Sequence, residues 1–161
     1  MRGVLGFIGG LAGAISLSQF PEFSQQYLQR LGGQRDALAA VVQAFDASAT
    51  ENGLTREAAL ADLSSSPFQL AHQADIRGTI ERLHRVEADL TLLRAAGPLE
   101  RLALPHRFRD TETFQATWND FKPAVPVTPE GLMAGGIGLA AGWLLISLLL
   151  GLILRPFRRH A

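Results

Sequence analysis

The sequence contains no cysteine, so disulfide bonds, zinc–thiolate sites, iron–sulfur clusters and thiol catalysis are all excluded. Lysine is almost absent, because Lys122 is the single lysine among 15 basic residues. Acidic residues are absent from both ends, since all 15 lie between Glu22 and Glu130. A nucleic-acid-binding protein concentrates positive charge on a folded face, whereas here the arginines outside this segment flank apolar runs. We therefore expect no nucleic-acid partner.

Motifs for catalysis are also missing. The sequence has no glycine-rich phosphate loop, no G-x-S-x-G and no H-E-x-x-H. Glu81 and His84 form one Glu-x-x-His unit, but a di-iron bundle needs a second copy and two more carboxylates. We expect Glu81 to pair with Arg85 on a solvated face, and His72 to face the bundle as a hydrogen-bonded residue rather than a ligand. The sequence thus predicts a non-enzymatic protein with no catalytic residues, no metal site and no cofactor.

What the sequence does contain is a long apolar run near its C-terminus. Residues 131–154 are 24 consecutive positions without charge. About 20 residues at 1.5 Å each suffice to cross a hydrocarbon core of roughly 30 Å. Arg155, Arg158 and Arg159 follow at once and indicate the cytoplasmic side of a membrane. We predict a transmembrane helix over 131–154 and a basic cytoplasmic tail over 155–161.

A second apolar segment lies at the N-terminus. Residues 3–20 carry no charge and approach the lower length limit for a span, which predicts a transmembrane helix over 1–20. The alternative is a secretory signal peptide, because Ala12, Gly13 and Ala14 resemble a cleavage site. The short, glycine-broken apolar region argues against cleavage. With Arg2 before this segment, both termini are predicted to be cytoplasmic and the middle of the chain periplasmic, in a bacterial inner membrane.

Small residues recur at four-residue intervals in both apolar segments. Such rows let helix backbones approach closely inside a bilayer, either between the two spans or with another chain. The competing interpretation is that glycine and alanine are simply common in membrane helices. Trp143 lies mid-span and is expected to pack against the glycines of the other span. The predicted helix-packing residues are Gly6, Gly10, Ala14, Ser18, Ala134, Gly138 and Gly142, with Gly9 and Gly13 as a parallel pair.

Between the two spans, the apolar periodicity is helical throughout. Residues 21–122 are predicted to form a periplasmic helical domain, and the proline-rich residues 123–130 a connector. Two helices of about 30 residues, which end at Asn52-Gly53 and Gly97-Pro98, are long enough to pair as an antiparallel hairpin or small bundle. The predicted fold is an all-α membrane protein in which two transmembrane helices flank this hairpin. Helix starts are expected at Thr55, Ser66 and Thr111.

Aromatic residues gather near both predicted membrane boundaries. Phe20, Phe23 and Tyr27 follow the first span, and a second group precedes the connector, as in an interfacial aromatic belt. Residues 106–110 are predicted to be a polar loop, with contact to anionic headgroups as the alternative. The second aromatic group is predicted to share one helix face and consists of Phe114, Trp118 and Phe121.

Residues 18–33 read Ser-Gln-Phe-Pro-Glu-Phe-Ser-Gln-Gln-Tyr-Leu-Gln-Arg-Leu-Gly-Gly. This stretch resembles the signature of an uncharacterised proteobacterial family of small proteins with one apolar segment at each end. The resemblance implies a Gram-negative inner-membrane origin but no activity. It also marks two features as interaction or turn sites: the turn at Phe20, Pro21 and Phe23, with Tyr27 beside it, and the pair Gly32-Gly33. At the glycine pair we expect either a helix bend or the close approach of another backbone.

These observations favour a non-enzymatic accessory or scaffold subunit of a larger membrane assembly, or a homo-oligomer. Its partners would be membrane lipids and other membrane subunits or itself. One alternative is a periplasmic ligand-sensing bundle, which would signal through a partner because only residues 155–161 follow the second span. Another is a lipid- or cofactor-binding membrane protein, with Phe114, Trp118 and Phe121 lining an apolar groove.

Overall fold

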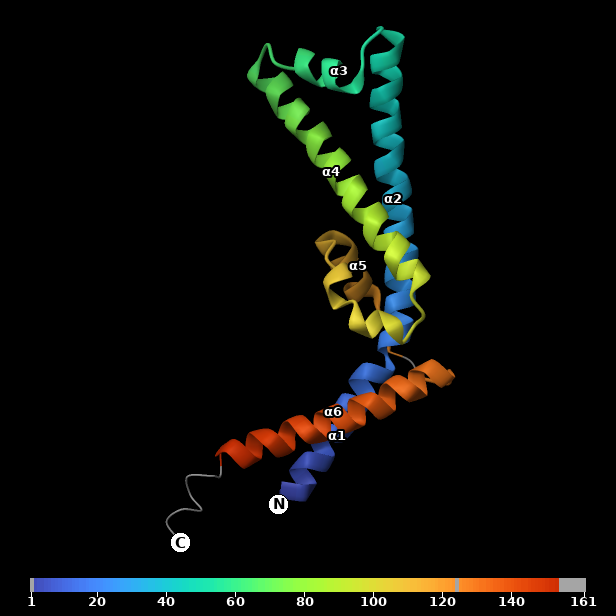
Figure 1. The fold of residues 1–161 in the computed structure, drawn as a ribbon, viewed down its shortest axis with the longest axis vertical. Coiled ribbons are helices and arrows are strands. Elements are labelled where there is room, and N and C mark those ends of the chain that lie inside the picture. Colours follow the sequence, from blue (N-terminus) through green and yellow to red (C-terminus); the bar gives the residue numbers. More distant parts are fainter. Residues whose placement is uncertain (1, 124, 154–161) are drawn as a thin grey trace. The chain divides into compact units, whose positions relative to one another are not determined.

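The computed structural model describes residues 2–123 and 125–153, and over these residues it is helical with no β-strand (Figure 1). The all-α prediction is therefore confirmed for the described part of the chain. The chain divides into two compact units. One contains Met1–Gln26, Ala96–Pro105 and Thr117–Ala161, and the other contains Tyr27–Ala95 and His106–Ala116. The helices are α1 (Arg2–Ser18), α2 (Phe20–Glu51), α3 (Arg56–Asp62), α4 (Pro67–Ala95), the 3₁₀ helices η1 (Glu100–Ala103) and η2 (Pro105–Arg107), α5 (Thr111–Asp120) and α6 (Pro129–Ile153).

The first unit is built around α1 and α6, which cross each other (Figure 1). Two helical stretches of the chain, Gly3–Glu51 and Pro129–Ile153, are long and apolar enough to cross a membrane. The first of these combines α1 with α2, because only Gln19 separates the two helices. Pro21 explains this break, since proline has no amide hydrogen to donate to the carbonyl oxygen four residues earlier. The chain re-enters helix at once, with the Phe23 amide donating to the Gln19 carbonyl.

Helix α6 begins at Pro129, two residues before the predicted start of the second span. The Thr128 hydroxyl accepts a hydrogen bond from the Gly131 amide at 3.1 Å, as an N-cap side chain does. Proline at the next position is favourable, because a first-turn amide has no partner within its helix. The non-helical connector therefore ends at Thr128, and the local capping chemistry sets this boundary.

In the second unit, local signals place the helix ends as predicted. Helix α2 ends at Glu51, and Gly53 adopts a positive φ of 71°, which glycine tolerates best. The Thr55 hydroxyl accepts from the Ala58 amide at the start of α3, and the Ser66 hydroxyl accepts from the Gln69 amide at the start of α4. One predicted cap is wrong. Asp110, and not Thr111, caps α5, because the Asp110 carboxylate accepts from the amide of Thr113.

Helices α2 and α4 run in opposite directions but diverge towards α3, which bridges their distant ends (Figure 1). The two helices therefore do not lie side by side along their whole length, as a simple antiparallel hairpin would. Side-chain contacts hold α3 in place on both sides. Arg56 pairs with Asp46 of α2, and the Gln73 side chain of α4 donates to the Leu60 carbonyl of α3. The buried apolar residues of this unit are Tyr27, Leu28, Leu31, Leu38, Val42, Ala49, Leu60, Ile76, Leu83, Val86, Leu90 and Leu93.

Two expectations about individual residues in this unit need correction. His72 is exposed and its ring stacks on the exposed Phe68. It therefore does not face the interior between the packed helices. Of the two alternatives at Gly32-Gly33, the close approach of another backbone is wrong for the part of the chain that the structure describes, because none lies within 4 Å of a Cβ atom built at either glycine; α2 continues through both. A Cβ atom at Gly32 would lie 3.0 Å from the Arg94 guanidinium, and one at Gly33 would meet nothing within 4 Å.

Candidate functional site

The first unit contains a close backbone contact between α1 and α6, the glycine seam, formed by Gly9 and Gly13 on one helix and Gly138 and Gly142 on the other. A Cβ atom added to Gly13 would overlap the Gly138 carbonyl, and one added to Gly142 would overlap the Gly9 carbonyl. These contacts pair low residue numbers in α1 with high numbers in α6, so the helices are antiparallel here. Backbone-to-backbone packing of this kind needs glycine on both helices.

The predicted four-residue row of α1 also faces α6. A Cβ atom at Gly6 would lie 3.1 Å from the Trp143 ring and from the Ser147 hydroxyl, and one at Gly10 would lie 3.0 Å from the Leu139 carbonyl. Trp143 therefore covers the glycines of the other helix, as its mid-span position predicts. Further along, the row continues towards the start of α6 with Ala14 and Ser18, which lie near Gly135, and Ala134 is fully buried.

The outward faces of α1 and α6 are bulky and apolar. Most of their large side chains are roughly half exposed or more, although a soluble helix pair would bury such residues. Helices that are surrounded by lipid are expected to place small residues at their contact face and large apolar residues on the opposite face. The exposed apolar residues are Val4, Leu5, Phe7, Ile8, Leu11 and Ile15 on α1, and Leu132, Met133, Ile137, Leu139, Leu144, Leu145, Leu148, Leu149, Leu152 and Ile153 on α6.

An aromatic cluster of the first unit centres on Phe23, which is nearly buried. The Trp118 and Phe121 rings contact it edge-on, with centroids 6.0 Å and 5.6 Å away. Trp118 itself is 64% exposed. Phe114, which the sequence placed with these two residues, instead contacts Tyr27 of the second unit edge-on. Of the three residues predicted to share one helix face, Trp118 and Phe121 thus contact Phe23, and Phe114 contacts Tyr27.

Arg101 of η1 is a buried arginine that the sequence did not single out. Its guanidinium lies 3.4 Å from the Ser24 hydroxyl and from the Gln25 side-chain oxygen, both near the start of α2. Burial lowers the pKa of Arg101, because the charged form loses hydration. These contacts tie η1 to the turn of helix that follows Pro21.

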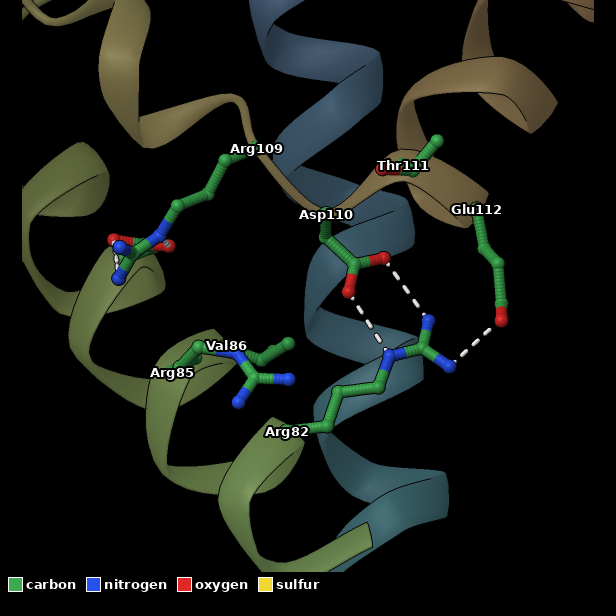
Figure 2. Close-up of a pocket in the computed structure, with 8 residues that line it drawn as sticks. Arg82, Arg85, Val86, Arg109, Asp110, Thr111 and Glu112 are labelled. Atoms are coloured by element: carbon green, nitrogen blue, oxygen red, sulfur yellow. Dashed lines mark hydrogen bonds and ion pairs between the residues drawn. The ribbon is translucent and has the colours of Figure 1, made fainter. Parts of the chain in front are cut away.

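The second unit contains a network of paired charges that joins α4 to residues 107–112, and Figure 2 shows the part of it around Arg82, Arg109 and Asp110. Asp89 of α4 is almost fully buried. It is an acidic residue among the buried apolar residues Val86, Leu90 and Leu93 of the same helix. It accepts hydrogen bonds from Arg107 at 3.1 Å and from Arg109 at 2.7 Å. The apolar stripe of α4 therefore carries one acidic residue whose charge is compensated by the segment that packs on it.

A second pair of the same network connects Arg82 with Asp110. The guanidinium of Arg82 donates to both Asp110 carboxylate oxygens at 3.0 Å, and it also contacts the Glu112 carboxylate at 2.7 Å (Figure 2). Burial alone would raise the pKa of Asp110, but hydrogen bonds from Arg82 and Thr113 outweigh burial and lower the pKa. The segment predicted as a polar loop is therefore a latch whose charged side chains face α4.

These paired residues border a hollow of about 240 Å³. Arg85 also borders it, and its guanidinium is only 3.8 Å from the Glu81 carboxylate, a weak solvent-exposed pair. Glu81 and Arg85 thus pair as predicted. His84 lies exposed beside them. Because every carboxylate around this hollow already has an arginine partner, its chemistry is that of a structural latch.

Tyr27 is completely buried beneath this latch. Its ring lies 4.8 Å from the Phe108 ring, and its hydroxyl has no hydrogen-bond partner among the described residues. Burial raises the pKa of Tyr27 to about 12. The latch thus closes over an aromatic core.

Some predicted features are not placed by the structure. Arg155, Arg158 and Arg159 lie outside the described residues. Within residues 2–123 and 125–153, no group of three histidine, aspartate or glutamate residues lies close enough to hold a metal ion. Phe20 is half-buried and Pro21 is buried, at the junction of α1 and α2.

An all-α chain with two apolar helices of membrane-spanning length, packed through glycine, defines the protein as a candidate two-span membrane protein. The chain belongs to the family described as "Protein of unknown function (DUF2937)", whose model matches residues 1–159. The prediction of an uncharacterised family is therefore confirmed. No curated protein and no solved structure matches the chain.

Proposed function

We propose that this protein is a non-enzymatic, two-span membrane protein that acts as an accessory or scaffold subunit of a larger membrane assembly, or as a homo-oligomer. The observation that carries the proposal is the glycine seam between α1 and α6. It holds the two helices together through their backbones and turns their bulky apolar side chains outward. Lipid or another membrane helix is the natural environment for such a surface.

Two features of the second unit support an interaction role. The latch of Asp89, Arg107 and Arg109 fixes the loop onto α4, so the unit presents a preorganised helical surface. The same unit exposes single large apolar side chains, among them Phe68 at 80% exposure. An exposed aromatic residue on a preorganised scaffold is a typical anchor for a protein partner.

We further propose that the membrane is the inner membrane of a Gram-negative bacterium, with residues 21–122 in the periplasm. The arginines at both ends support this orientation, because basic residues beside spans concentrate on the cytoplasmic side. The net negative charge between Glu22 and Glu130 is consistent with this orientation, since it leaves the arginine excess outside that segment.

Cysteine accessibility tests the orientation directly, because the sequence contains no cysteine. Ser64→Cys places a thiol in the exposed loop between α3 and α4, and Ala161→Cys places one at the C-terminus. In cells with a permeabilised outer membrane, a membrane-impermeant maleimide should label Ser64→Cys and should spare Ala161→Cys until the inner membrane is lysed. Labelling of both variants before lysis, or of Ala161→Cys alone, would reject the proposed topology.

The mass of the complex in a mild detergent tests the assembly role. We expect either a multiple of the 17.4 kDa chain or the chain together with a second polypeptide. The first result selects the homo-oligomer and the second selects the accessory subunit. Gly138→Val should separate α1 from α6, so we expect this variant to lose the complex. Gly151→Val is its matched control and should keep it. A lone monomer in every gentle detergent would reject both forms of the proposal.

A further inference from the structure

Two adjoining hollows of the first unit lie where α1 passes into α2 and the connector leads into α6. The larger has a volume of about 600 Å³ and the smaller about 360 Å³, which is the size range of ligand sites. Four residues line both hollows, so the two are continuous: Ser18, Gln19, Val125 and Pro126.

The larger hollow is apolar. Its walls include Ile15 of α1, the side chains of Val125 and Pro126, and Leu132 and Leu139 of α6. Gly136 also lines it, and among residues 2–123 and 125–153 nothing lies within 4 Å of a Cβ atom built there, so this wall is open. Val125, which lines this hollow, is 83% exposed, although valine is normally buried. An alkyl chain is the occupant that such walls favour.

The smaller hollow has a mixed polar and apolar lining that carries both signs of charge. Its lining includes Glu22, Lys122 and Glu130. Among the described residues neither Lys122 nor Glu130 has an ion-pair partner, and Glu22 accepts one hydrogen bond, from Gln26 at 2.9 Å. One ammonium and two carboxylates around one hollow are complementary to a zwitterion that carries both a phosphate and an ammonium group.

We infer that these joined hollows bind a glycerophospholipid with an amine-bearing zwitterionic headgroup. An acyl chain occupies the apolar hollow against Ile15 and Leu132, the phosphate pairs with Lys122, and the ammonium pairs with Glu130 and Glu22. This inference rests on the proposed insertion of α1 and α6 in a membrane, because only then does the apolar hollow open to lipid. An anionic lipid would leave the two carboxylates uncompensated, so the site selects against it.

The test uses the full chain, reconstituted in vesicles that contain equal amounts of phosphatidylethanolamine and phosphatidylglycerol. Resistance to alkaline carbonate extraction first establishes that α1 and α6 are inserted, and extraction of the protein at this step would reject the proposed function. Native mass spectrometry of the inserted protein then gives the retained lipid. We expect phosphatidylethanolamine to be retained about tenfold over phosphatidylglycerol, which corresponds to roughly 1.4 kcal/mol.

Two variants and their controls separate binding from folding. Gly136→Leu should fill the apolar hollow and abolish retention, whereas Gly151→Leu, on the same helix and equally unobstructed, should retain lipid as the wild type does. Glu130→Lys should invert the preference towards phosphatidylglycerol, whereas Glu51→Lys at an exposed glutamate should leave it unchanged. An inserted protein that retains no lipid, retains both lipids equally or prefers phosphatidylglycerol would overturn the inference, as would lipid retention by Gly136→Leu at the wild-type level.

Discussion

Gly13 of α1 and Gly138 of α6 meet backbone to backbone, and neither position has room for a Cβ atom against the carbonyl of the other. Lipid does not drive helices together by the hydrophobic effect, so close van der Waals contact between such residues contributes much of the association energy. The pairing of α1 with α6 therefore depends on the absence of side chains at the seam.

Gly138→Val should separate the two helices. The added side chain would collide with the α1 backbone, and overpacking of this kind costs about 1–3 kcal/mol. Gly151→Val is the matched control, because no described residue lies within 4 Å of a Cβ atom built at Gly151. Unfolding of the reconstituted protein by sodium dodecyl sulfate, followed by tryptophan fluorescence, gives both stabilities. Equal stabilities for the two variants would refute the seam.

A disulfide bond should form between Ser18→Cys and Gly135→Cys. A Cβ atom at Gly135 would lie 3.4 Å from the Ser18 Cβ atom, close to the spacing that disulfides require. Because the sequence contains no cysteine, no other pairing competes within the chain. Mild oxidation should give an intramolecular bond, detected as the loss of two hydrogen atoms in the intact mass.

The control for this pair moves one cysteine by a single residue. Gly136→Cys combined with Ser18→Cys places the second thiol in open space, since nothing lies within 4 Å of a Cβ atom there. This double variant should remain reduced. If it forms the bond as readily as the Ser18 and Gly135 pair, the antiparallel register of α1 and α6 is incorrect.

The sequence predicts the two apolar helices, their packing row and several helix ends well, because the features that determine them are local. Apolar length indicates the two spans, the four-residue spacing of glycine indicates the packing row, and Thr55, Ser66 and Gly53 define helix ends through their own backbone preferences. Each of these signals is contained within a few neighbouring residues, so no knowledge of tertiary structure is needed.

The latch was not predictable in the same way. Asp89 forms ion pairs with Arg107 and Arg109, which follow it in the sequence by 18 and 20 residues. No local sequence pattern specifies a contact between residues so far apart. One signal was nevertheless present in the sequence. Asp89 stands beside Val86, Leu90 and Leu93 of the apolar stripe, and an acidic residue at such a position needs a compensating partner.

Asp89→Asn should destabilise the second unit strongly. Asparagine keeps the shape but removes the charge that Arg107 and Arg109 compensate, and breaking a buried ion pair in this way costs roughly 3–5 kcal/mol. Glu57→Gln is the matched control, because its pair with Arg77 is exposed and is worth less than about 1 kcal/mol. Thermal denaturation followed by circular dichroism measures both variants. Similar melting temperatures for the two would show that the latch contributes no more than a surface pair.

The acidity of Asp110 gives the same latch a pH dependence. Its pKa is lower in the folded protein than in the unfolded chain because Arg82 and Thr113 donate to the carboxylate. The resulting stabilisation is present above the unfolded pKa of about 3.9 and is lost as the pH falls through the lower folded value. Stability of the wild type should therefore fall more steeply below pH 4 than stability of Asp110→Asn. Parallel acid denaturation curves would contradict this expectation.

Tyr27 provides the alkaline counterpart, and it can be observed alone because it is the single tyrosine of the sequence. Its absorbance change near 295 nm should have a midpoint at about 12 in the folded protein and at about 10 in the unfolded chain. Because the folded pKa is raised, stability is unaffected below pH 10 and should decrease by roughly 2–3 kcal/mol between pH 10 and 12.

Tyr27→Phe should remove this alkaline loss of stability. It also deletes a buried hydroxyl that has no partner among the described residues, so stability at pH 7 should be unchanged or higher by up to about 1 kcal/mol. Far-ultraviolet circular dichroism along the same titration shows whether the helices persist while the ring ionises. A folded-state midpoint near 10, with the helices intact, would mean that the ring reaches water and that the latch does not close over it.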